Sequence, residues 1–313
     1  MTVRFHVTHP LISHPYHPEL VTGPGVVALA QAAEAAGFDG YGFTDHPAPS
    51  QRWLDQGGHD ALDPFVALGF VAAATSTIRL IPNIVVLPYR NPFVVAKAAA
   101  TLDVLSGGRF TLATGVGYLE AEFTALGVDH AERAALFDEA LEVLVAVWTG
   151  DEVAFTGLHF EASGVTAHPR PVATPHPPIW VGGNSAAARR RVAERGHGWA
   201  PFAAPKGMAR FVGTAPLDGG DLLVAGIADL HRRLEDAGRD PASVDISFSC
   251  AAGGNPGSDE FDAGAHLEGL AALAALGVTW VQVGLPGDSP ARALETVERY
   301  GELVIGPHRS ASR

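Results

Sequence analysis

Polar residues capable of acid–base chemistry directly follow two of the short apolar runs in this sequence. Asp45 and His46 come after the run Gly40–Thr44, and Glu120 comes soon after the run Phe110–Thr114. A histidine in such a place can transfer a proton near neutral pH or hydrogen-bond a bound ring, and a carboxylate can serve as a second acid or base. Each also has a structural interpretation. His46 can be satisfied by hydrogen bonds within the protein, and Glu120 can be an acid at the start of a helix.

A glycine-rich turn, Gly182–Ser185, separates the apolar run Ile179–Gly182 from a helical pattern over Ala186–Arg195. Glycine lets a backbone approach a ligand closely, and the free N–H groups at a helix N-terminus attract anions. The turn can therefore hold a phosphate group. Alternatively, Asn184 or Ser185 only caps the helix, and the turn by itself leaves both interpretations open.

Two further features argue against common nucleotide and metal sites. Gly115 and Gly117 match the first half of a dinucleotide fingerprint, but Glu120 stands where the third glycine would be. The chain has 14 histidines, yet His6 and His9 lie an odd number of residues apart on a predicted strand and so face opposite sides. A metallohydrolase barrel would place two histidines on one face of this strand. We therefore expect no catalytic metal.

The elements that must position these residues alternate along the chain. Eight β-rich runs are separated by segments with helical periodicity. The runs are Val3–His9, Gly40–Thr44, Arg79–Val86, Phe110–Thr114, Ile179–Gly182, Gly198–Ala200, Val244–Ala251 and Trp280–Gly284. This alternation predicts an α/β fold of parallel strands that closes most simply into a (β/α)₈ TIM barrel. A doubly wound sheet is the alternative, but the first run leads into His9–Ile12 and not into a glycine-rich turn.

One segment breaks the alternation. Within Gly150–Pro178, the stretches Val153–Phe155 and His159–Glu161 flank a turn and predict a hairpin. We expect a single barrel domain over residues 1–306, with this segment as an insertion between the fourth and fifth strands. Residues 307–313 are expected to form a frayed tail.

The composition limits the classes of partner. Of the 313 residues, 47% are hydrophobic, which is enough for a substantial core, and the net charge is −13. An acidic chain is a poor candidate for binding nucleic acid or an anionic membrane. Cys250 is the only cysteine, so an intrachain disulfide and a cysteine zinc site are excluded. The N-terminal stretch lacks the apolar region of a signal peptide, and we expect a cytoplasmic protein.

Several stretches, taken in chain order, resemble the luciferase-like monooxygenase family, and most of all its oxidoreductases that use the deazaflavin coenzyme F420. The stretches are Gly37–Gly40 with Thr44–His46, Ile78–Pro88, Arg90–Pro92, Ala99–Arg109, Gly115–Tyr118 with Glu122–Phe123, Pro178–Ser185 and Gly196–Trp199. The run LDVLSGGR within Ala99–Arg109 is the most specific of them. Together they cover roughly residues 3–200.

The resemblance implies a TIM barrel with a flavin or deazaflavin across the carboxyl ends of its strands. It implies a phosphate site at Gly182–Ser185, a cis peptide at Asn83–Ile84, His46 at the ring or substrate, and Glu120 as a second proton donor. The implied cofactor-binding residues are His9, Asp45, Asn83, Ile84, Gly115, Gly117, Tyr118, Gly182, Gly183, Asn184, Ser185 and Trp199.

The expected activity is hydride transfer between F420 and a small organic substrate, by a homodimer. The alternatives are an FMN-dependent monooxygenase that uses reduced flavin and dioxygen, a metallohydrolase barrel, and a flavin-binding protein without turnover. His197 stands where the family often has an aspartate. Ser50 stands near the place of a tryptophan in the family's sugar-phosphate dehydrogenases, with Trp53 displaced, which argues against a sugar-phosphate substrate.

Overall fold

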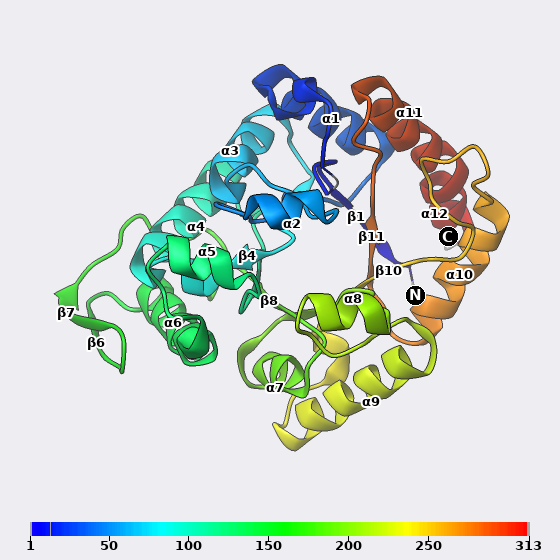
Figure 1. Ribbon diagram of the computed structural model, residues 1–313. Helices are drawn as coiled ribbons and strands as arrows, with labels where there is room; N and C mark the ends of the chain where they lie inside the picture. Colours follow the sequence, from blue (N-terminus) through cyan, green and yellow to red (C-terminus); the bar gives the residue numbers. More distant parts are fainter. Residues whose placement is uncertain (1, 13, 312–313) are drawn as a thin grey trace.

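Nine strands form one parallel sheet that curls on itself, with helices around its outside (Figure 1). The computed structural model describes residues 2–12 and 14–311. The strands are β1 (Arg4–Thr8), β2 (Gly40–Gly42), β3 (Arg79–Leu80), β4 (Val85–Val86), β5 (Leu112–Gly115), β8 (Ile179–Gly182), β9 (Gly198–Ala200), β10 (Asp245–Ser249) and β11 (Trp280–Val283). Their order in the sheet is β3-β2-β1-β11-β10-β9-β8-β5-β4. The α/β fold with a curled parallel sheet is therefore confirmed.

The predicted third strand is divided into β3 and β4. β3 pairs with β2, and β4 pairs with β5. Leu80 of β3 also forms a parallel bridge with Phe110, just before β5, so the two ends of the sheet meet there. The Asn83–Ile84 peptide bond between β3 and β4 is cis, as the resemblance implied.

The long helices begin and end at the residues that local chemistry favours. They are α1 (Gly23–Ala36), α3 (Pro64–Ala74), α4 (Pro92–Ser106), α6 (Arg133–Thr149), α7 (Ala186–Arg195), α9 (Gly220–Asp236), α10 (Ala263–Ala275) and α11 (Pro290–Tyr300). Asp63 caps α3 by accepting hydrogen bonds from two backbone N–H groups, with Pro64 at the first helical position. Gly37 and Gly107 end α1 and α4 in the left-handed conformation.

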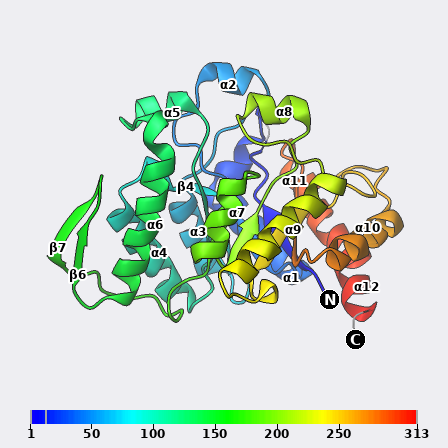
Figure 2. The same ribbon diagram turned by 90° about the horizontal axis from the view of Figure 1, so that it is seen from below.

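Three short helices lie together at one end of the molecule (Figure 2). They are α2 (Gln51–Asp55), α5 (Glu120–Ala125) and α8 (Lys206–Phe211). They follow the carboxyl ends of β2, β5 and β9. In a parallel α/β fold the functional residues gather at this end, so these helices enclose the region where the polar stretches converge.

The predicted hairpin is present as β6 (Val153–Thr156) and β7 (Glu161–Val165), which pair antiparallel between α6 and β8. It projects from the body of the molecule beside α6 (Figure 1). His159 joins it to α6, because its Nδ1 lies 2.7 Å from a carboxylate oxygen of Glu139.

The predicted frayed tail is wrong for residues 307–311, which belong to helix α12 (Gly306–Ala311). The Arg309 guanidinium donates to the Gly37 carbonyl at 2.7 Å and to Asp39 at 2.9 Å. These bonds join the C-terminal helix to the connection between α1 and β2. Residues 312–313 lie outside the described part. No helix in the described ranges combines the length and apolar composition that a membrane crossing requires.

Candidate active site

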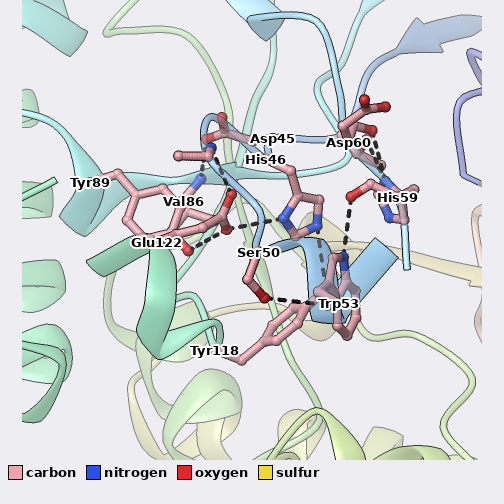
Figure 3. A network of polar contacts seen from close by, with 12 residues as sticks. Asp45, His46, Ser50, Trp53, His59, Asp60, Val86, Tyr89, Tyr118 and Glu122 are labelled. Carbon is pink, nitrogen blue, oxygen red and sulfur yellow. Dashed lines mark hydrogen bonds and ion pairs between the residues drawn. The ribbon is translucent and has the colours of Figure 1, made fainter. Parts of the chain in front are cut away.

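A buried histidine–carboxylate pair is the centre of the site (Figure 3). His46 Nδ1 lies 3.0 Å from Oε2 of Glu122, whose side chain is fully buried. The Tyr89 hydroxyl donates to the same oxygen at 2.9 Å, and the backbone N–H of Ala48 donates to the other at 3.1 Å. Because a carboxylate only accepts hydrogen bonds, His46 carries its proton on Nδ1, and its ring orientation is set by Glu122.

The second nitrogen of His46 faces a small aromatic enclosure. The Tyr118 hydroxyl lies 3.5 Å from Nε2, and the rings of Trp53 and His59 have centroids 6.0 Å and 4.6 Å from that of His46. Burial and the charge of Glu122 raise the pKa of Tyr118, so its phenol stays neutral and can donate a hydrogen bond. With its proton on Nδ1, His46 presents the lone pair of Nε2 to this enclosure.

Asp45 is hydrogen-bonded to other residues of the protein and does not face the same enclosure. Arg90 holds both of its oxygens, at 2.5 and 2.8 Å, and the N–H of Val86 donates to it at 2.8 Å. Two parallel N–H···O bonds fix a carboxylate in distance and direction. Asp45 thus joins the end of β2 to β4 and positions the backbone that carries His46.

The apolar floor beside this pair is built from one isoleucine and two glycines. A Cβ atom on Gly115 would lie 2.3 Å from Cδ1 of Ile84, and one on Gly182 would lie 2.7 Å from the same atom. Any side chain at either position would displace Ile84. The glycines at the ends of β5 and β8 therefore leave room for the Ile84 side chain at the carboxyl end of the sheet.

The side chains of the Gly182–Ser185 turn have structural roles. Ser185 caps α7 by accepting from Ala188 N–H at 3.2 Å, and Asn184 bonds to both the N–H and the carbonyl of Phe202. The buried Trp199 donates to the Gly183 carbonyl at 2.9 Å and so supports the turn from behind. Gly183 has a φ of 105°, and a Cβ there would meet nothing closer than 3.7 Å. An anion at this turn would therefore be held by backbone N–H groups.

Besides Asp45 and the side chains of the turn, three more of the residues expected at the site lie elsewhere or act structurally. Glu120 is exposed and lines a surface hollow on α5 with Thr124 and His130. His9 bonds through both ring nitrogens, to the Tyr41 hydroxyl at 2.5 Å and the Leu20 carbonyl at 2.8 Å. Gly117 turns the chain into α5, with a φ of 76°.

Sequence reasoning missed the residues that complete the enclosure. Glu122 entered only as part of a resembling stretch, although it is the partner of His46. Trp53 follows the histidine by more residues than expected, yet α2 brings its ring close to His46. Asn83, which the resemblance did imply, donates through its amide to the Thr8 hydroxyl at 3.0 Å.

No group of three His, Cys, Asp or Glu side chains within residues 2–12 and 14–311 is arranged to hold a metal ion. His9 and Asp45 are each engaged in hydrogen bonds within the protein.

Curated proteins from several bacteria are similar to this chain in sequence. It is 31% identical over 260 residues to an uncharacterized protein of Mycobacterium tuberculosis, covering 82% of this chain and 79% of that one. It is 29% identical over 227 residues to an uncharacterized protein of Sinorhizobium fredii. That match covers 72% of this chain but only 57% of the other protein. It is 33% identical over 165 residues to the FMNH₂-dependent dimethylsulfone monooxygenase of Pseudomonas putida, covering 51% of this chain and 44% of that one.

Solved structures share the fold at low sequence identity. The monooxygenase RslO1 of Streptomyces bottropensis superposes with a TM-score of 0.80 at 20% identity, covering 98% of this chain and all of the other. The F420-dependent tetrahydromethanopterin reductase of Methanopyrus kandleri has a TM-score of 0.73 at 19% identity, and the match covers 98% of this chain and 100% of the other. The model of the luciferase-like monooxygenase family matches residues 5–298. The chain therefore belongs to the luciferase-like monooxygenase family.

Proposed function

We propose that this protein transfers a hydride between coenzyme F420 and a small organic substrate at the His46–Glu122 pair. The observation that carries the proposal is the orientation of His46, whose Nδ1 is held by a buried carboxylate at 3.0 Å. This leaves Nε2 to exchange a proton with the oxygen or nitrogen of a substrate. A proton must move whenever a hydride reduces a carbonyl or leaves an alcohol.

The residues fit a flat ring that carries a phosphate tail. Ile84 between Gly115 and Gly182 forms an apolar surface for the ring, and the N-terminus of α7 would take the phosphate through its backbone N–H groups. A bound deazaflavin would supply the hydride carrier. Trp53 and Tyr118 lie 5.8 Å apart, ring to ring, on the other side of His46, where they limit access of water.

An FMN-dependent monooxygenase is the second candidate. It is favoured by the 33% identity to the monooxygenase of Pseudomonas putida, whose name states that it depends on reduced FMN. The floor and the phosphate turn would suit both ring systems.

We also infer the finer architecture of the scaffold. The bridge from Leu80 to Phe110 supports a closed barrel of eight strand positions in which β3 and β4 are two parts of the third strand. In that numbering β5 is the fourth strand and β8 the fifth. The hairpin β6–β7 is then the insertion between them.

A parallel titration of the purified chain with F420 and FMN tests the proposal. We expect F420 to bind at least about tenfold more tightly, and reduced F420 to be oxidised when an acceptor is added. Gly69→Ala, on the outer face of α3, is the control that should leave both affinities unchanged. Tighter binding of FMN would replace the proposal by the monooxygenase candidate. Binding of neither would contradict the site itself.

A further inference from the structure

A second histidine, His59, stands beside the catalytic pair. It lies in the segment between α2 and α3, and its ring meets that of His46 edge to face, with an interplanar angle of 86° and centroids 4.6 Å apart. The backbone that carries it is fixed, since its carbonyl accepts a hydrogen bond from the Trp53 indole at 3.1 Å. The view in Figure 3 shows the two rings next to each other above Trp53.

The hydrogen bonds of His59 determine which nitrogen carries the proton. Its Nδ1 lies 3.0 Å from the backbone carbonyl of Asp60, and a carbonyl oxygen can only accept. Nδ1 is therefore protonated and Nε2 has the lone pair. Within the described part of the chain, no donor is bonded to Nε2; the neighbouring Thr44 hydroxyl lies 3.5 Å from Nδ1.

The charge state of the ring is set by its surroundings. Burial and the proximity of His46 lower the pKa of His59 to about 4, although Asp60 and Glu122 act in the opposite direction. At neutral pH the ring has no charge, and Nε2 is an acceptor. The two histidines thus differ in their partners: Nδ1 of His46 is bonded to a carboxylate, whereas Nδ1 of His59 is bonded to a neutral carbonyl.

We propose that His59 determines substrate specificity, with Nε2 accepting a hydrogen bond from a hydroxyl or N–H group that the substrate carries next to its reacting carbon. The proposal rests on the proposed function, because it takes His46 as the group that exchanges the proton. A site that offers an acceptor discriminates against a substrate without the donor, since the acceptor is then left without a partner. His59 would thus select among substrates that His46 alone would accept.

The first test needs no substrate. Nitrogen-15 NMR of the histidine-labelled chain should show His59 with a protonated Nδ1 and a bare Nε2 from about pH 5.5 to 8. Protonation of Nε2, or titration of the ring near the ordinary histidine value, would overturn the proposal. This result is independent of whether F420 binds.

The second test uses two probes that share a secondary hydroxyl, propylene glycol and its monomethyl ether, added to the chain with and without F420. Only the glycol has a second donor. We expect it to bind about tenfold more tightly and to shift the Nε2 resonance, whereas the ether should not shift it. His59→Phe should remove this preference, and His59→Asn, which retains an acceptor, should restore part of it. Equal responses of the original chain to the two probes would refute the role of His59, whereas lack of F420 binding would refute only the proposed cofactor.

Discussion

The group bonded to Nδ1 of His46 determines what its Nε2 can do. Glu122 accepts hydrogen bonds from His46, Tyr89 and the Ala48 backbone at 2.9–3.1 Å, so both of its carboxylate oxygens have partners within the protein. A carboxylate in this position fixes the ring plane and keeps the proton on Nδ1. Glu120, two residues earlier on α5, is exposed and contributes to neither effect.

Glu122→Gln tests this assignment. The amide retains a single acceptor oxygen, which can serve Ala48 or Tyr89 but not both, and it no longer carries a charge beside His46. Turnover should therefore fall at least about a hundredfold while the Kd for F420 changes little. Steady-state kinetics and a cofactor titration measure the two effects. Glu120→Gln is the matched control on the same helix, and it should stay within about twofold of the original chain. A comparable loss in both variants would contradict the role of Glu122.

At the level of the strands, the floor of the site depends on the absence of side chains at the ends of β5 and β8. Cδ1 of Ile84 occupies the space that a Cβ on Gly115 would need, at 2.3 Å. Interiors tolerate such overlap poorly, because neighbouring side chains must leave their preferred rotamers. The floor is therefore a joint property of Ile84 and the two glycines.

Gly115→Ala should raise the Kd for the cofactor about tenfold, because the added Cβ would push the Ile84 side chain towards the space proposed for the ring. Adding Ile84→Val removes the atom that clashes, and the double variant should recover most of the affinity. Fluorescence titration of the two variants provides the comparison. If Ile84→Val fails to rescue Gly115→Ala, the clash is not the cause of the loss.

A helix carboxylate holds the turn before β3. Glu34 of α1 accepts hydrogen bonds from the backbone N–H groups of Ser76, Thr77 and Ile78 at 2.6–3.1 Å. Burial alone would raise the pKa of Glu34, but these bonds outweigh it and lower the pKa from 4.5 to about 2. A lowered pKa means that the carboxylate stabilises the fold above pH 4.5 and loses this effect as the pH falls from 4.5 towards 2.

Glu34→Gln should therefore lower the free energy of unfolding by about 1 kcal/mol at pH 7. Its deficit relative to the original chain should shrink as the pH falls below 4.5. Urea unfolding at a series of pH values measures this difference. Glu302→Gln, at an exposed carboxylate of the C-terminal region, serves as the control and should show no such trend. A deficit independent of pH would rule out the charge as its source.

For the molecule as a whole, the outer surface of α3 is unusual. This helix has no charged or polar residue, and Val66 and Phe70 are 66% and 52% exposed on one face. On the neighbouring α4, Val94 and Leu105 are 65% and 75% exposed. Exposed apolar side chains of this size on neighbouring helices are typical of interfaces. We propose that a second copy of the chain covers this face, in agreement with the homodimer implied by the resemblance.

Light scattering of the purified chain should give about twice the mass of one 32.6 kDa chain. Phe70→Asp would place a charge in the apolar interface and should shift the mass to that of the monomer. Leu158→Asp makes the same kind of change on the hairpin, at a residue that is 81% exposed, and should leave the dimer intact. A monomeric original chain would contradict the proposal.

Much of the architecture follows from signals that lie within a few residues of each other. Asp63 with Pro64 begins α3, and Gly37 and Gly107 end their helices in the left-handed conformation. Alternating apolar runs predicted the strands within a few residues, because side-chain period and turn chemistry are local properties. The break of the third strand into β3 and β4 was not predicted, since its apolar composition continues across the break.

By itself, the sequence determined the α/β fold and the family, and it predicted a site at His46. Which residues meet His46 was decided only by tertiary structure. Glu120 and Glu122 lie on one short helix, and only the packing of α5 against Tyr89 decides that Glu122 is the one turned inward. Trp53 and His59 both belong to the segment between β2 and α3, and the course of this segment brings both side chains next to the His46 ring. Such contacts depend on how separate elements pack, and no local pattern encodes that geometry.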